Sequence, residues 1–231
     1  SILLGLAEVR NLRGRLVALP LSDDARWEID FRLDAKEQQF ARAAVLAHGL
    51  RLEALADDGL VTPDQPVTIS VLVANPSTDN VIVDQVSFAG FGQASVACGE
   101  DVLASGGLVI YQCSSELRIS ANAEPTDIHW THVPGTARYA FDDNLSFGLP
   151  FRPTPFRAIF DVEFSSGRVS IEQPIEYRYA DDIFAGEKRT ALIVVPQLAV
   201  EITPEIVIIP GQAKASQEVR VTVTNNGREP A

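Results

Sequence analysis

The chain contains 231 residues, of which 46% are hydrophobic, and it carries a formal net charge of −12 from 31 acidic and 19 basic side chains. This length accommodates one large domain or two modest ones, each with a hydrophobic core. The acidic balance disfavours nucleic acid and anionic membranes as partners, because both bind basic surfaces, and no apolar run is long enough to span a bilayer.

Residues 1–49 are expected to form a helical lead-in. Apolar residues recur every three or four positions from Leu4 to Leu19, as on one side of an α-helix, and Pro20 ends the pattern. Two helices cannot enclose a core by themselves. We therefore expect them to pack on the following domain or on a further domain, and an exposed apolar stripe on residues 4–19 would indicate the second case.

The second of these helices is expected to begin near Asp34. This residue is a candidate N-cap, because Glu37 follows three positions later as in a capping box, and Gly49 supplies the C-terminal stop. The buried stripe of this helix is expected to consist of Phe40, Ala43, Ala44 and Ala47.

Residues 50–197 are expected to form an antiparallel, immunoglobulin-like β-sandwich, so the fold class is mainly β with a short helical segment before it. Segments that alternate between apolar and polar residues are separated by turn-forming residues, which is typical of such folds. The expected strands are residues 50–56, 67–74, 81–88, 108–112, 117–120, 158–164, 168–172 and 190–195.

Two stretches have nearly the same sequence. Residues 65–76 read QPVTISVLVANP, and residues 217–227 read QEVRVTVTNNG. β-Branched residues at every second position predict a strand with one buried face, so residues 198–231 are expected to begin a second, incomplete β-sandwich module. Since the chain also lacks methionine, we expect an interior piece of a longer polypeptide, whose unpaired strands in 198–231 can pair with another chain.

Residues 122–155 are rich in proline and aromatic residues, and we expect an ordered loop that is pinned onto the core. Aromatic rings stack on the C–H faces of sugars, while carboxylates bind sugar hydroxyls. The loop therefore supplies the candidate ligand-binding residues, although packing of the loop itself would use the same residue types. These candidates are Trp130, Tyr139, Phe141, Asp142 and Asp143.

His129 and His132 in the same loop are the candidates for a metal site. A zinc site needs a third and usually a fourth ligand, which two neighbouring histidines do not specify. We therefore predict no metal, no cofactor and no catalytic residue in this chain. The two imidazoles are expected to lie packed within the loop or exposed on it.

Cys98 and Cys113 are the only cysteines in the sequence. They flank a segment that can fold back on itself, so they can form a disulfide, which would indicate an oxidising compartment. Two small buried residues are the other interpretation, because sequence spacing does not fix the Cβ geometry that a disulfide requires. Both interpretations stay open at this stage.

Several short sequence segments in the chain are similar to segments of a known protein family. They are ARWEIDFRL at 25–33 with KEQQF at 36–40, LEALADDG at 52–59, FGLPFRPTPF at 147–156 and IFAGEKR at 183–189. Over most of residues 20–195 the chain resembles the bacterial LmbE-like (PIG-L) deacetylase proteins, in the part that follows their catalytic domain. The tail from Val200 resembles the start of an immunoglobulin-like domain of the NPCBM-associated type, found on glycoside-active enzymes.

The resemblance implies a role beside a deacetylase domain. That domain uses a zinc site built from a His-Pro-Asp-Asp-Glu motif and acts on N-acetylated sugars, and the motif is absent from this chain. The nearest approach is Ala47-His48-Gly49, and Asp57-Asp58 is followed by glycine. No catalytic residue can be carried over, so the resemblance implies a non-catalytic accessory region. An extracytoplasmic or secreted location is expected, and a cytoplasmic location stays open.

Three functional hypotheses follow. The first is an accessory region that positions an upstream catalytic domain of the same polypeptide, or helps it reach a glycan. The second is a free-standing carbohydrate- or protein-binding module. The third is a hydrolase with a site in loop 122–155. A well-packed loop with no cleft would argue against binding, whereas three converging ligands around His129 and His132 would favour the enzyme.

Overall fold

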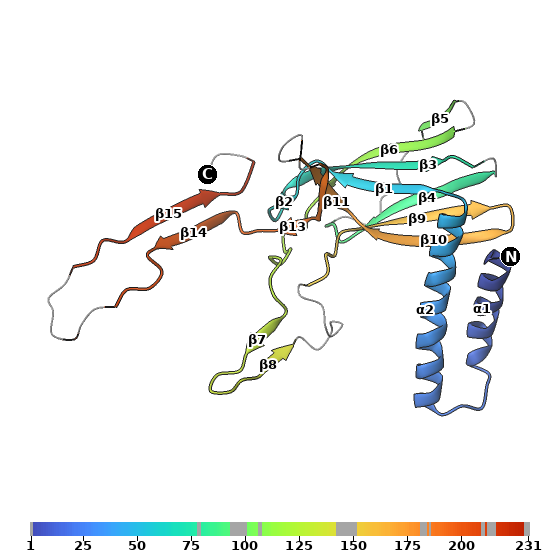
Figure 1. Cartoon of the computed structure of the whole chain (residues 1–231), viewed down its shortest axis with the longest axis horizontal. Coiled ribbons are helices and arrows are strands. Elements are labelled where there is room, and N and C mark those ends of the chain that lie inside the picture. The colour runs from blue at the N-terminus through green and yellow to red at the C-terminus, as the bar shows by residue number, and fades with distance from the viewer. Residues whose placement is uncertain are drawn as a thin grey trace.

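The computed structural model shows a mainly β protein, as the sequence predicts (Figure 1). It describes residues 2–77, 80–92, 101–105 (backbone alone), 108–141, 152–180, 184, 186–208, 211 and 216–228. Two helices open the chain, α1 (Ile2–Leu16) and α2 (Asp23–Ala47). The described strands are β1 (Arg51–Ala56), β2 (Leu60–Val61), β3 (Pro66–Asn75), β4 (Val81–Ala89), β5 (Asp101–Ser105), β6 (Leu108–Arg118), β7 (Trp130–His132), β8 (Tyr139–Phe141), β9 (Arg157–Phe164), β10 (Gly167–Pro174), β11 (Glu176–Tyr179), β12 (Lys188–Ala191), β13 (Ile193–Val194), β14 (Leu198–Thr203) and β15 (Arg220–Asn225).

Two sheets form the body of the molecule. One has the strand order β12-β11-β1-β3-β6-β5, and the other has the order β10-β9-β4. Alternate residues of β3 and β9, among them Val71, Val73, Phe160 and Val162, belong to one buried cluster. Because successive side chains of a strand point to opposite faces, each sheet contributes one apolar face to this common core.

The sheets are not purely antiparallel, which corrects the sequence-based expectation. β1 pairs with β11 in parallel, through Leu55 opposite Glu176, and β2 pairs with β13 in parallel. Parallel neighbours need a long connection, and in both cases most of the sandwich is inserted between the two strands. Residues 108–112 and 117–120 were expected as two strands, but the single strand β6 runs through both, from Leu108 to Arg118, and Ile119 and Ser120 lie beyond its end.

The second helix starts earlier than the capping-box pattern predicts. α2 begins at Asp23, where the side chain of the N-cap Ser22 accepts a hydrogen bond from the Ala25 amide at 3.3 Å. Asp34 lies inside the helix, so its assignment as an N-cap was wrong. Its carboxylate instead lies 2.9 Å from the guanidinium of Arg13 on α1. The buried residues of α2 are Ala41, Ala44 and Val45, and Ala47 is exposed.

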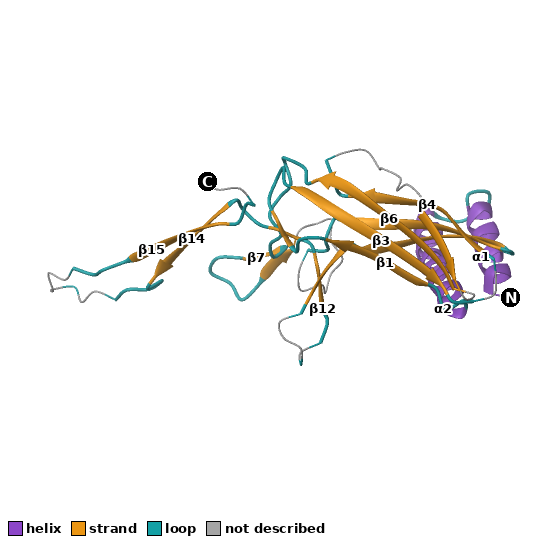
Figure 2. Cartoon of the chain, turned by 90° about the horizontal axis from the view of Figure 1, so that it is seen from above, coloured by secondary structure: helices purple, strands orange, loops and turns teal. Residues whose placement is uncertain are grey.

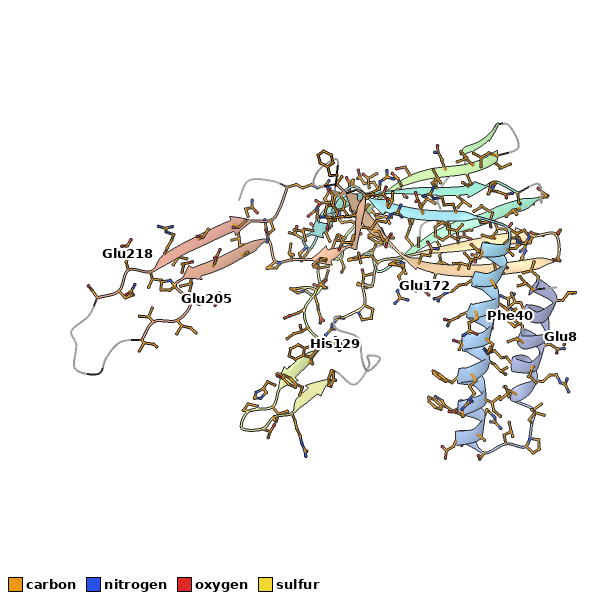
Figure 3. The ribbon with its side chains drawn as sticks, in the orientation of Figure 1. Glu8, Phe40, His129, Glu172, Glu205 and Glu218 are labelled. Carbon is orange, nitrogen blue, oxygen red and sulfur yellow. The ribbon has the colours of Figure 1, made fainter. Side chains whose placement is uncertain are left out.

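The two helices form a hairpin that packs on the β10 side of the three-stranded sheet (Figures 1 and 2). Leu3, Leu6 and Ala44 join the buried core of the sandwich. Between the helices, Gly5 lies so close to the Phe40 ring that a Cβ there would sit 2.7 Å from Cε1 (Figure 3). The helices therefore pack on the sandwich with one end and extend away from it with the other.

The tail forms a separate β14–β15 hairpin beyond the opposite end of the sheets (Figure 2). In the part of the chain that is described, neither helix has the length and apolarity needed to cross a membrane. Cys113 on β6 is disulfide-bonded, whereas Cys98 lies outside the described residues.

Candidate ligand-binding site

Strands β7 and β8 form a small hairpin that extends from the sandwich (Figure 1). Within the segment 122–155, which the sequence predicts as an ordered loop, β7 and β8 are two short strands, and residues 142–151 lie outside the described residues. The turn between the strands is closed by the Val133 amide, which donates to the Arg138 carbonyl at 3.0 Å, and Gly135 adopts a φ of 77°. Glycine suits this position because it enters the left-handed region without a steric penalty.

The register of this hairpin places its aromatic residues on one face. Trp130 lies opposite Phe141, and His132 lies opposite Tyr139. The Tyr139 ring stands edge-on to Trp130 with centroids 5.0 Å apart, and to His132 with centroids 5.4 Å apart. We refer to Trp130, His132, Tyr139 and Phe141 as the aromatic face. Edge-to-face pairs are a favoured aromatic geometry, so the Tyr139 ring supports those of Trp130 and His132.

The aromatic face is open to solvent. Tyr139 is 52% exposed and Phe141 is 43% exposed. An exposed group of large aromatic side chains is typical of a surface that binds a ligand or partner. The structure thus brings together Trp130, Tyr139 and Phe141 from the candidate set. Asp142 and Asp143 lie outside the described residues.

The base of the hairpin is fixed to the sandwich by two hydrogen bonds between Thr126 and Val194. The Thr126 amide donates to the Val194 carbonyl at 2.8 Å, and the Val194 amide donates to Thr126 Oγ1 at 3.0 Å. These bonds join the start of the hairpin to β13. Two hydrogen bonds therefore anchor to β13 the hairpin that carries the aromatic face.

The two histidines of this segment have different environments. His129 is 2% exposed, its ring centroid lies 6.0 Å from that of Phe141, and its ring nitrogens have no hydrogen-bond partner among the described residues (Figure 3). His132 lies on the exposed aromatic face, with Nε2 2.7 Å from the Thr136 carbonyl oxygen. Over the described ranges, no group of three or more His, Cys, Asp or Glu side chains is arranged to hold a metal ion.

A cavity of about 440 Å³ lies between α2 and the strands β9 and β10. Its wall includes Arg42, Ile159 and Ser170, together with Arg157, which bonds Glu172 at 2.5 Å. No sequence pattern predicts this cavity, because its wall combines a helix with strands that are distant along the chain. Its lining is mostly polar and contains no aromatic ring, so it lacks the stacking surface that the aromatic face offers.

Two other sequence features have structural roles. His48, the nearest approach to a deacetylase motif, is the C-cap of α2; its Nδ1 lies 2.7 Å from the Ala44 carbonyl oxygen and its ring packs on Phe164. The second feature is a pair of carboxylates close together in the sequence, Glu172 and Glu176. They lie on different strands, β10 and β11, and Glu176 contacts Arg189 at 3.5 Å. Comparison with known protein families, curated proteins and solved structures found no match to this chain.

Proposed function

We propose that this chain is a binding module that engages a glycan through its aromatic face. The observation that supports the proposal is the gathering of Trp130, Tyr139 and Phe141 on one exposed face of an anchored hairpin. Ring faces of this kind stack on the C–H surface of a pyranose, and the neighbouring His132 can exchange hydrogen bonds with hydroxyl groups. A protein ligand that inserts apolar side chains is the alternative for the same surface.

The wider context of the proposal comes from the sequence. The phrases that resemble the region after an LmbE-like catalytic domain favour an accessory role, without catalysis in this chain, for a protein that acts on N-acetylated sugars. We take the two sheets as an immunoglobulin-like sandwich that carries the glycan-binding hairpin. The disulfide-bonded Cys113 supports an extracytoplasmic location, since disulfides persist in oxidising compartments.

The helical hairpin is proposed as the contact with an upstream domain of the same polypeptide. Leu4 and Leu12 on α1 are exposed, as expected if another domain covers this helix. On α2, Trp27 and Phe31 are also exposed and stack on each other with centroids 5.6 Å apart. In a Trp130→Phe background, addition of the preceding domain should bury Trp27 and shift its fluorescence to shorter wavelength. Unchanged emission in the extended protein would contradict this contact.

Glycan binding can be tested with the two tryptophans as separate reporters. In a Trp27→Phe variant, Trp130 is the only tryptophan, and titration with the N-acetylglucosamine tetramer chitotetraose should give a saturable change in its emission. The matched Trp130→Phe variant retains Trp27 alone and should give no change. Tyr139→Ala in the Trp27→Phe background should weaken binding at least tenfold, because it removes a ring that contacts Trp130.

The outcomes separate the alternatives. Absence of any emission change with chitotetraose and with other neutral oligosaccharides would contradict a glycan site. Binding that persists undiminished in Tyr139→Ala would place the ligand away from the aromatic face. Thermal unfolding of each variant, measured in parallel, shows whether a loss of binding reflects a loss of fold.

A further inference from the structure

The β14–β15 hairpin is an amphipathic two-stranded ribbon. Val200 pairs with Val223 and Ile202 pairs with Val221 across one face, while Glu201 lies on the opposite face. We call the first surface the ribbon's apolar face. Its members, on the strands or directly beside them, are Leu198, Val200, Ile202, Val219, Val221 and Val223, and each of them is 48–63% exposed. A two-stranded ribbon cannot bury such a face by itself.

The ribbon repeats the β1–β3 hairpin of the sandwich. In the sandwich Leu52 pairs with Val73, and in the ribbon Val200 pairs with Val223 at the corresponding position. The strand also ends in the same way in both copies. Asn75 Oδ1 accepts a hydrogen bond from the Ser77 amide at 3.0 Å. The second copy has the equivalent bond, from the Gly227 amide to Asn225 Oδ1, also at 3.0 Å.

The two copies differ in what covers them. In the sandwich, the face that contains Ile69 and Val71 is buried against the other sheet, in a cluster with Phe160 and Val162. The first copy therefore shows the kind of surface that complements this hairpin, which is the apolar face of another β-sheet. Among the described residues no sheet lies over the apolar face of the ribbon, since each of its six members is about half exposed or more.

We propose that the apolar face of the ribbon packs on the same face of a second copy of this chain, forming a four-stranded sandwich at a two-fold interface. The face carries no charged side chain, so two copies oppose no like charges there, although the chain has a net charge of −12. The ribbon also extends away from the body, which keeps the two acidic bodies apart (Figure 1). An interface of this symmetry requires a self-complementary surface, and an uncharged apolar face meets that requirement.

The available area is sufficient for a dimer. At their observed exposures the six apolar side chains present roughly 500 Å² per copy, so the contact removes roughly 1,000 Å² from water, the lower bound for a specific interface. Ile206 and Ile208, which are 80% and 89% exposed, follow β14 in the chain. Edge-to-edge pairing of two ribbons, the association that the sequence predicted, would leave the side chains of the apolar face in water. The free energy of apolar burial therefore favours packing by faces.

The base of the ribbon is held to the sandwich. Arg228, just after β15, lies 3.2 Å from Asp57 and 3.3 Å from Asp58 in the turn after β1. Within the ribbon, the Asn226 amide donates to the Gln197 carbonyl at 2.8 Å and continues the strand pairing beyond β15. These contacts fix the ribbon before association, which reduces the ordering cost of forming a dimer.

Sedimentation velocity across protein concentrations tests the proposal. The wild-type chain should change from monomer to dimer as concentration rises, and should associate more strongly at higher salt, which screens repulsion between the acidic bodies. Val221→Lys places a charge in the centre of the apolar face and should weaken association by about 100-fold. The neighbouring Thr222→Lys is the matched control on the opposite face and should associate like the wild type.

Three results would overturn the proposal: a wild-type chain that stays monomeric at high concentration, a Val221→Lys variant that still dimerises, or a Thr222→Lys variant that is equally impaired. Thermal unfolding of the sandwich in each variant distinguishes a lost contact from a lost fold. Chitotetraose binding should be the same in Val221→Lys as in the wild type. The proposed dimer and the proposed glycan site can therefore be tested independently.

Discussion

Val71 and Val221 occupy equivalent positions in two copies of one β-hairpin, yet Val71 is 3% exposed and Val221 is 58% exposed. Val71 pairs with Ala54 on β1, and Val221 pairs with Ile202 on β14. The β1–β3 and β14–β15 pairings are equivalent, but β3 also pairs with β6, where Val71 lies opposite Cys113. The difference in burial therefore comes from this further strand and from the surface that lies over each hairpin. This contrast provides a matched pair of sites in one molecule.

Replacing each valine by threonine should therefore have unequal effects on stability. Val71→Thr buries a hydroxyl in the core and should lower the free energy of unfolding by about 1–3 kcal/mol. Val221→Thr should change it by less than about 0.5 kcal/mol in the monomer, since the side chain is exposed. Urea unfolding at a concentration below dimerisation measures both. Equal effects of the two substitutions would contradict the difference in burial.

Gly90 should be intolerant of substitution. It follows β4 with a φ of 90°, and a Cβ at this position would lie 2.3 Å from the Pro155 carbonyl oxygen. Gly90→Ala should thus combine left-handed strain with a backbone collision and cost more than about 3 kcal/mol.

Gly135 in the β7–β8 turn is the matched control for Gly90. It has a φ of 77°, but no described residue other than its two chain neighbours has an atom within 4 Å of an added Cβ. Gly135→Ala should cost only the backbone strain, about 1–2 kcal/mol, in the same urea measurement. If the two variants were equally stable, the close approach of Gly90 to Pro155 would be wrong.

Glu53 on β1 should make stability depend on pH. A hydrogen bond from Arg189 at 2.8 Å holds the pKa of Glu53 below its ordinary value of 4.5, against partial burial, which raises it. Because the folded pKa is lower than the unfolded one, this contribution is fully present above pH 4.5 and is lost as the pH falls through the folded pKa. The wild type should therefore lose stability progressively in acid.

Glu53→Gln should remove this part of the pH dependence and lower stability at pH 7 by about 1 kcal/mol, because a charge-assisted hydrogen bond becomes a neutral one. Melting temperatures between pH 7 and pH 3 would report both effects. Glu8→Gln, at an exposed position with no ion pair among the described residues, is the control and should follow the wild type. An unaltered acid profile in Glu53→Gln would exclude this carboxylate as its source.

Much of the fold could be predicted from local sequence patterns. Alternation identified strands such as β3 and β9, and helical periodicity identified α1 and the presence of α2. The start of α2 could not be predicted in the same way, because Ser22 and Asp34 both have the chemistry of an N-cap. In the folded chain Asp34 instead contacts Arg13, and this contact exists only when the two helices are packed.

The candidate site could likewise be predicted only in part. The sequence indicated which aromatic residues were available, but a loop around them does not predict how their side chains are arranged. Cross-strand register, which places Trp130 opposite Phe141 and His132 opposite Tyr139, creates the aromatic face. The parallel pairing of β1 with β11 is likewise a contact between segments far apart in the chain. Such pairings depend on the whole fold, so no window of sequence contains them.

The repeated hairpin distinguishes what the sequence determined from what the tertiary structure determined. The sequence by itself determined that residues 65–76 and 217–227 would both form strands with one apolar face, because β-branched residues alternate in both. Only the tertiary structure decided that Val71 is buried and Val221 is exposed. The physical reason is that amphipathicity is a property of the strand, whereas burial requires a second apolar surface, and that surface comes from residues outside the repeat.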